Sequence, residues 1–216
     1  MFVIVTGGDP PVPGVVARLP KGARVIAADS GLDHAQTLGL PVELVVGDLD
    51  SVSAAGLARA EQAGVTVERH PVDKDAVDLE LGIDAAVALG ATHIVVVAGG
   101  GDRLDHLMAG LLLLGHPRLA AVRVEAWYGS AHLVALQGPS ETALEGPEGT
   151  YVTLLPIGGD ARGVTTTGLR FTLAGDALGA GTTRGVSNEL VGGPASVRIE
   201  AGCLLVITPY ALGGGA

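Results

Sequence analysis

The sequence predicts an α/β N-terminal domain with a mainly parallel sheet, followed by an all-β sandwich C-terminal domain. Over the first ~125 residues, short apolar runs alternate with segments whose apolar residues recur at helical spacing. After Gly129 the helical spacing is lost, and short β-like runs are separated by Gly, Pro and Asp. Hydrophobic residues make up 48% of the 216 residues and charged residues 17%, a composition that can bury a core. We expect two domains, residues 1–128 and residues 129–216.

In the N-terminal half, strands are expected where a short apolar run meets a Gly, Asp or Pro. These strands are residues 2–6, 24–28, 42–46, 66–71, 93–100 and 123–127. Helices are expected between them, at residues 32–40, 53–64, 75–90 and 104–115. Gly39 and Gly90 end the first and third of these helices. Strands that are apolar on both faces and alternate with helices are typical of a parallel sheet covered by helices.

The C-terminal half is expected to contain strands and no helix. The β-like runs are residues 132–136, 151–157, 168–173, 195–201 and 203–209. Residues 137–149 are rich in Gly, Pro and Glu, and we expect a loop or hairpin there. Short strands separated by frequent turns are typical of a small sandwich or barrel.

The charge and cysteine content exclude several kinds of protein. The net charge is −10, and no run of Lys and Arg is present, so a surface for nucleic acid or anionic membrane is not expected. The single cysteine, Cys203, allows no intrachain disulfide and is expected in the core. The first residues lack a basic region, and the longest apolar stretch is too short to span a bilayer. We therefore expect a cytoplasmic protein.

Acidic residues follow the predicted strands. They are Asp29, Asp48, Asp50, Asp102 and Asp105. Because ligands of open α/β sheets bind outside the carboxyl ends of the strands, these acids are expected to converge there if the strands are parallel. Close carboxylates repel one another unless a cation neutralises them, and oxygen ligands favour Mg²⁺ over zinc. An ordinary turn, with Asp50 and Ser51 capping the next helix, is the alternative for the Asp48–Asp50 pair.

The start of the long predicted helix adds two further acids. Asp75 and Asp78 are three residues apart and share one helix face, which is also an ordinary way to start a helix.

The glycine-rich segment 99–101 is a candidate phosphate-binding loop. Its backbone N–H groups and the donor fork of Arg103 suit phosphate oxygens. Asp105 is a candidate helix cap or metal ligand, and His106 a packing residue or a general base.

In the C-terminal half, Ser187 and Asn188 are the polar residues of interest. They could fix a turn through side-chain-to-backbone hydrogen bonds, or recognise a polar heterocycle.

Taken in order, six segments resemble the motif series of the thiamine pyrophosphokinase family. They are ADSGLD, GDLDS, DKDAVDLE, GGGDRLDH, TTTGLRF and GVSNE. The resemblance extends from about Ala28 to Ile207 and implies a homodimer with active sites between subunits. It also implies Mg²⁺-dependent transfer of a pyrophosphoryl group from ATP to the thiamine hydroxyl, giving thiamine diphosphate and AMP. Domain 1–128 would then bind nucleotide and Mg²⁺, and domain 129–216 would contribute to the thiamine site and to dimerisation.

The resemblance also implies roles for individual residues. The residues implied in catalysis are Asp48, Asp50, Asp78, Arg103 and Asp105. The first three are the expected Mg²⁺ ligands, and either Asp78 or Asp105 could accept the hydroxyl proton. The residues expected to bind nucleotide or phosphate are Asp29, Ser51, Gly100, Gly101, Arg103 and His106. Ser187 and Asn188 are expected near thiamine.

The chain departs from the family pattern at four positions. These are Ser30 for a glycine, Val77 for a threonine, Asp102 for a glycine and Gly110 for an asparagine. None of them removes a proposed metal ligand. Three other functions remain open: a pyrophosphokinase for another hydroxymethyl heterocycle such as a pterin, a non-catalytic thiamine or nucleotide sensor, and a metal-dependent phosphatase using Asp48 and Asp50.

Overall fold

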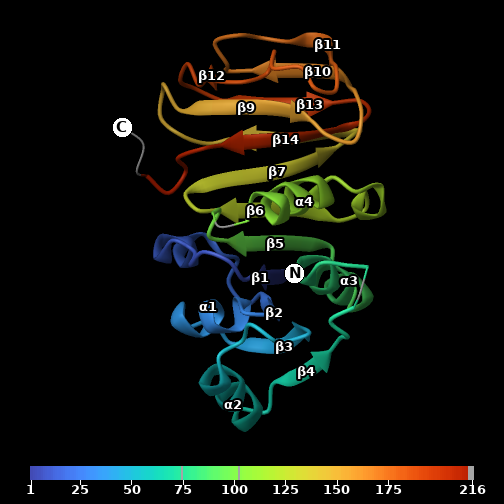
Figure 1. Ribbon diagram of the computed structural model, residues 1–216. Coiled ribbons are helices and arrows are strands. Elements are labelled where there is room, and N and C mark those ends of the chain that lie inside the picture. Colours follow the sequence, from blue (N-terminus) through green and yellow to red (C-terminus); the bar gives the residue numbers. More distant parts are fainter. Residues whose placement is uncertain (74, 102, 214–216) are drawn as a thin grey trace. The chain divides into compact units, whose positions relative to one another are not determined.

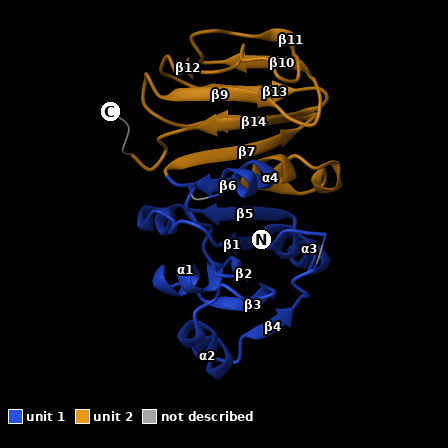
Figure 2. Ribbon diagram, in the orientation of Figure 1, with its two compact units in different colours: residues 1–110, 126–129 blue, residues 111–125, 130–216 orange. Residues whose placement is uncertain are grey.

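The computed structural model describes residues 1–73, 75–101 and 103–213. The chain forms two compact units, and Figure 2 distinguishes them by colour. Unit 1 comprises Met1–Gly110 and Ala126–Gly129, and unit 2 comprises Leu111–Glu125 and Ser130–Ala216. Each unit has a hydrophobic core of its own. No helix among the described residues is both long and apolar enough to cross a bilayer.

Unit 1 contains a parallel sheet with the strand order β5-β1-β2-β3-β4 (Figure 1). Its strands are β1 (Phe2–Val5), β2 (Arg24–Ala28), β3 (Val42–Gly47), β4 (Thr66–Arg69) and β5 (His93–Ala98). The helices that connect them are η1 (Pro13–Arg18), α1 (Gly31–Thr37), α2 (Ala54–Gln62) and α3 (Asp78–Ala88). Helix α4 (Leu104–Leu114) and strand β6 (Arg123–Tyr128) each begin in one unit and end in the other. The prediction of an α/β region with a mainly parallel sheet is confirmed.

The apolar runs became strands because both faces of this sheet are covered. All four residues of β1 are buried, as are the last four of β2 and the last five of β5. Strand β4 lies at the edge and is largely exposed, in keeping with its polar sequence. The short helix η1 is the one element described in unit 1 that we did not predict.

One predicted helix start is wrong: helix α3 begins at Asp78, and Val77 rather than Asp75 is its N-cap residue. Helix α2 begins where it was predicted, because Ser53 caps it and its hydroxyl accepts a hydrogen bond of 2.9 Å from the Gly56 N–H. The alternative in which Asp50 and Ser51 cap this helix is therefore wrong. The cap falls at Ser53 because residues 48–52 are used to make the turn out of β3.

Unit 2 contains two antiparallel groups of strands, ordered β12-β9-β14-β7 and β11-β10-β13-β8. The first group is β7 (Ala131–Gln137), β9 (Tyr151–Pro156), β12 (Asn188–Glu189) and β14 (Cys203–Thr208). The second group is β8 (Ser140–Leu144), β10 (Ala161–Thr167), β11 (Ala174–Leu178) and β13 (Ala195–Ile199). One core contains side chains from both groups, among them Leu154 from the first and Val197 from the second. This region is β-rich and antiparallel, as we expected, although it also contains the short helix η2 (Pro117–Leu119).

The predicted strand at residues 168–173 is wrong. Strands β10 and β11 flank this segment, and within it only Leu169 forms an isolated bridge, with Leu190. The reason is that the Asn188 side chain forms the hydrogen bonds that a neighbouring strand would otherwise make. It bonds both the N–H and the carbonyl of Phe171.

Substituting Gly31 by alanine should destabilise unit 1, because a Cβ there would lie 2.0 Å from the Val5 carbonyl oxygen. Helix α1 and strand β1 would have to separate, and we expect a loss of about 3 kcal/mol in the free energy of unfolding, measured by urea denaturation. Gly14→Ala is the matched control, because a Cβ on Gly14 meets nothing within 4 Å. It should change stability by less than about 1 kcal/mol. Equal midpoints for the two variants would show that Gly31 is not constrained.

Candidate functional site

The carboxyl ends of the parallel strands of unit 1 surround a cavity of about 640 Å³. Its walls are the segments that follow β1, β2, β3 and β5, the first turns of α3 and α4, and the last residue of β6. The polar residues among those that line it are Thr6, Asp9, Asp29, Ser30, Asp48, Asp50, Ser51, Asp78, Arg103, His106 and Tyr128. The expected convergence of acids at the strand ends is therefore present for Asp29, Asp48 and Asp50, whereas Asp105 is not among the residues that line the cavity.

Three carboxylates meet within this cavity. Asp29, Asp48 and Asp50 each present an oxygen, and these oxygens all lie within 4.8 Å of one another. Asp78 lies close by, because its Oδ1 is 3.0 Å from the position of a Cβ built on Gly47. The sequence suggested Asp48, Asp50 and Asp78 as metal ligands, and the geometry adds Asp29 to that set.

Left-handed backbone at two residues builds this arrangement. Asp29 has φ 50° and Leu49 has φ 65°, conformations that cost non-glycine residues about 1–3 kcal/mol each. The Leu49 side chain is buried in the core of unit 1 beside Ala27 and Leu32, as we expected for the residue between the two acids. With Leu49 anchored inward, Asp48 and Asp50 both face the cavity.

The carboxylates of this cluster repel one another electrostatically. The Asp48 charge is the largest of several effects that raise the pKa of Asp50; desolvation and the charges of Asp29 and Asp78 add to it. The Asp29 Oδ2 accepts a hydrogen bond from the Ser51 hydroxyl. Its Oδ1 is shielded from solvent and has no hydrogen-bond partner within the described part of the chain. Clustered carboxylates, a raised pKa and an unsatisfied buried oxygen fit a site for a hard divalent cation such as Mg²⁺.

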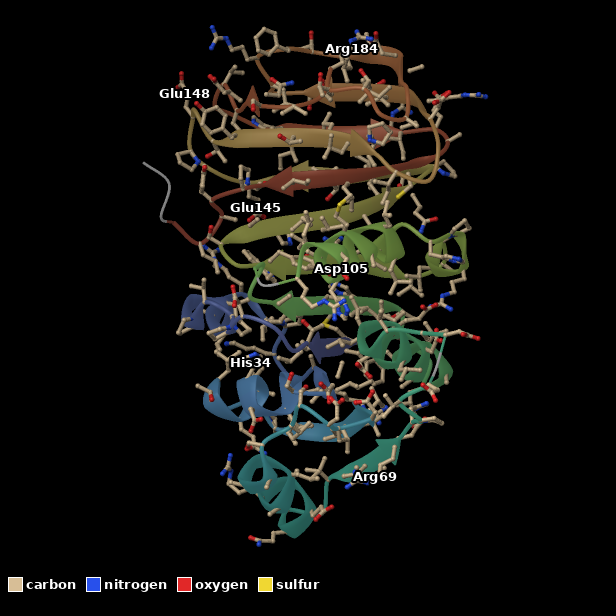
Figure 3. All side chains as sticks on the ribbon, in the orientation of Figure 1. His34, Arg69, Asp105, Glu145, Glu148 and Arg184 are labelled. Carbon is tan, nitrogen blue, oxygen red and sulfur yellow. The ribbon has the colours of Figure 1, made fainter. Side chains whose placement is uncertain are left out.

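Arg103 is the cationic side chain in the cavity wall, and Asp105 holds it from one side. The Asp105 carboxylate accepts hydrogen bonds from Arg103 Nη2 at 2.5 Å and Nε at 3.2 Å, and Figure 3 labels Asp105 on α4. Chiefly through the hydrogen bond from Arg103, the pKa of Asp105 falls to about 2. Asp105 is therefore ionised near neutral pH and orients the guanidinium, while His106 lines the cavity in the next position.

The remaining residues predicted to bind phosphate also line the cavity. They are Ser51, Gly100 and Gly101. Asp102 lies outside the described residues. The loop after β1 is held by His34, whose Nε2 lies 2.9 Å from the Gly8 carbonyl oxygen.

Ser187 and Asn188 belong to unit 2. The buried Asn188 side chain accepts hydrogen bonds of 2.9 Å from the N–H groups of Phe171 and Glu189, and its Nδ2 donates to the Phe171 carbonyl at 2.7 Å. Ser187 has φ 57°, and its N–H donates to Thr153 Oγ1 at 3.0 Å. Of the two interpretations of this pair, the fixed turn is what the described contacts of Asn188 support. Its hydrogen bonds hold a loop that exposes the Phe171 ring.

Asp9 and Tyr128 are among the cavity residues that were missed in the sequence. Asp9 follows Gly7 and Gly8 at the end of the first strand, and Tyr128 ends β6. Both residues lie at the carboxyl end of a strand, as Asp29 and Asp48 do. Their positions at strand ends could therefore have identified them from the sequence.

Removing the guanidinium should restore an ordinary pKa to Asp105. In Arg103→Gln we expect the pKa of Asp105 to rise from about 2 toward about 4, followed by NMR titration of the carboxyl group. Because this pKa is lowered in the folded protein, the stabilising effect is present above about pH 4 and is lost as the pH falls toward 2. Arg69→Gln removes an exposed arginine from β4 instead and should leave Asp105 unchanged (Figure 3). An unaltered pKa in Arg103→Gln would contradict the ion pair.

Two family models match the chain. The model described as "Thiamin pyrophosphokinase, catalytic domain" matches residues 18–126. The model described as "Thiamin pyrophosphokinase, vitamin B1 binding domain" matches residues 139–204.

Known proteins and solved structures are similar over nearly the whole length. A thiamine pyrophosphokinase from Bacillus subtilis is 26% identical over 207 residues, which is 94% of this chain and 96% of that protein. The crystal structure of thiamine pyrophosphokinase from Bacillus subtilis has a TM-score of 0.83 at 25% identity, covering 96% of this chain and 97% of that chain. Thiamin pyrophosphokinase from Candida albicans shares the fold, with a TM-score of 0.76 at 13% identity over 95% of this chain and 88% of that one. With a family model over more than half of its residues, this chain belongs to the thiamin pyrophosphokinase family.

Proposed function

We propose that this protein transfers the pyrophosphoryl group of ATP to the hydroxyl of thiamine, giving thiamine diphosphate and AMP. The observation that carries the proposal is the meeting of Asp29, Asp48 and Asp50 with Arg103 in one cavity. Three carboxylates alone would repel a polyphosphate, whereas carboxylates that hold a divalent cation beside an arginine attract one. Membership of the family supports this choice of reaction.

In the proposed reaction the thiamine hydroxyl oxygen forms a bond to the β-phosphorus of ATP. The bond from that phosphorus to the oxygen bridging toward the α-phosphorus breaks, that oxygen leaves with AMP, and the hydroxyl proton is released. Mg²⁺, when held by Asp29, Asp48, Asp50 and Asp78 or by some of them, would neutralise phosphate charge. Transfers of this kind depend mainly on positioning and on electrostatic stabilisation.

Arg103 supplies the positive charge that the protein itself contributes. Asp105 fixes the plane of its guanidinium, and the planar donor fork of an arginine suits phosphate oxygens. A carboxylate with a pKa of about 2 is a poor proton acceptor near neutral pH, so Asp105 is disfavoured as the general base. Of the two candidates from the sequence, Asp78 is the one we propose.

Thiamine recognition is assigned in this proposal to unit 2. The vitamin B1 binding model covers both Ser187 and Asn188. Because the Asn188 side chain is engaged by the backbone of Phe171, we propose that it acts by fixing this loop. The exposed Phe171 ring would then offer a flat apolar surface to the heterocycle.

Replacing Asp50 by asparagine tests the proposal directly. Wild-type protein with Mg-ATP should release AMP when thiamine is added, and Asp50→Asn should lower that rate about 100-fold or more, because one charge of the cation site is lost. AMP and thiamine diphosphate are measured together by chromatography. Glu43→Gln is the control: Glu43 lies on β3, the strand that precedes the turn with Asp50, and its substitution removes only an exposed ion pair with Arg24. The rate of this variant should stay near wild type.

The same assay separates the alternatives. Release of AMP with a pterin alcohol but not with thiamine would indicate the other pyrophosphokinase. Binding of ATP and thiamine without any AMP would indicate a sensor, and release of inorganic phosphate without thiamine would indicate a phosphatase. Each of these results would overturn the proposed reaction, as would an Asp50→Asn variant with a normal rate.

We also propose that the protein is a homodimer, as the family resemblance implies. Helix α4 supports this, because Leu104, Met108 and Leu112 are exposed at intervals of one helical turn. Light scattering should give the mass of a dimer for the wild type and of a monomer for Met108→Glu. Val72→Glu, at an exposed apolar residue in a loop, is the control and should remain dimeric. A monomeric wild type would refute the dimer, and a dimeric Met108→Glu would place its interface elsewhere.

A further inference from the structure

Tyr128 occupies a position in the cavity wall that the proposed reaction does not use. It ends β6 and lines the cavity together with Leu79 and Leu107. These three side chains form an apolar part of the wall, in contrast to the carboxylates that follow β2 and β3. All of these residues belong to unit 1, so this feature lies within one compact unit.

A glycine in the middle of a helix makes room for the tyrosine. Gly110 lies inside α4, where glycine costs about 1 kcal/mol relative to alanine. A Cβ at this position would lie 2.6 Å from the Tyr128 hydroxyl oxygen and 3.3 Å from Leu79 Cδ2. Helix α4 therefore contains a destabilising residue, Gly110, at the turn that the Tyr128 side chain approaches. This indicates that the position of the Tyr128 hydroxyl is important.

The Tyr128 hydroxyl keeps its hydrogen-bonding capacity unused within the described residues. It has no partner there, although Tyr128 is half-buried and tyrosines in such surroundings usually find one. Burial raises the pKa of Tyr128 to about 12, so the hydroxyl keeps its proton and can donate a hydrogen bond at any physiological pH.

We propose that Tyr128 binds the nucleoside part of the nucleotide, with its hydroxyl donating to a ring nitrogen or a ribose oxygen and its ring packing on the base. The phosphates need cationic partners, and these are at Arg103 and at the carboxylate cluster. The part of the wall that contains an aromatic ring and two leucine side chains suits a flat heterocycle instead. The inference rests on the proposed function only in taking an adenine nucleotide as the ligand of this cavity.

Tyr128→Phe removes the hydroxyl and keeps the ring, so it isolates the hydrogen bond. Calorimetric titration in the presence of Mg²⁺ should show an AMP dissociation constant about three to ten times that of the wild type. The dissociation constant of inorganic pyrophosphate, which has no nucleoside, should remain within about twofold of the wild type. Tyr210→Phe removes an exposed hydroxyl from unit 2 and should change neither constant.

A second variant acts on the same hydroxyl from the helix. Gly110→Ala should displace the phenol and weaken AMP binding at least as much as Tyr128→Phe, with pyrophosphate binding unchanged. Unaltered AMP affinity in Tyr128→Phe, or an equal loss for AMP and pyrophosphate, would overturn the proposal. Because binding is measured without turnover, a protein that binds AMP through Tyr128 yet forms no thiamine diphosphate would refute the proposed function and leave this inference standing.

Discussion

The repulsion among carboxylates at the ends of β2 and β3 is the constraint on which the rest of unit 1 depends. A parallel sheet brings the ends of neighbouring strands together, so acids placed there must share one small volume. Asp29, Asp48 and Asp50 do so, and the raised pKa of Asp50 is the measure of what their proximity costs. In the proposed reaction a bound cation would offset this repulsion, because the negative charge that destabilises the free cluster would attract the cation.

Other polar groups around the cavity are arranged to keep this charge in place. The Ser51 hydroxyl satisfies one oxygen of Asp29, and Asp105 satisfies two donors of Arg103. In unit 2 the buried polar side chain of Asn188 has a different use, because it forms hydrogen bonds with the backbone of Phe171. One unit therefore leaves oxygens available to a ligand, whereas the other uses a side-chain amide as a structural brace.

The elements of unit 1 were predictable because apolar runs and helical periods were unambiguous there, and the strand-end rule then located Asp29, Asp48 and Asp50. Three details were not predictable. Helix α3 begins at Asp78 rather than at the predicted Asp75, and no side-chain hydrogen bond caps it, so its start has no capping signal in the sequence. The segment around Phe171 has strand-like residues but is held by Asn188, a contact between positions 17 residues apart that no local pattern encodes. Tyr128 stands at a strand end, but the space for its hydroxyl comes from Gly110, a residue distant in sequence whose missing side chain no local pattern reveals.

The buried Leu49 side chain has a consequence for how the cavity would bind a cation. Its anchor holds the turn between Asp48 and Asp50 in a left-handed conformation that is shaped before any ligand arrives. A cation bound in the proposed site would therefore have little chain to immobilise, and the entropic cost of its association would be small. A turn held in this way would also readjust little to ions of different radius, so it would favour ions of one size over others.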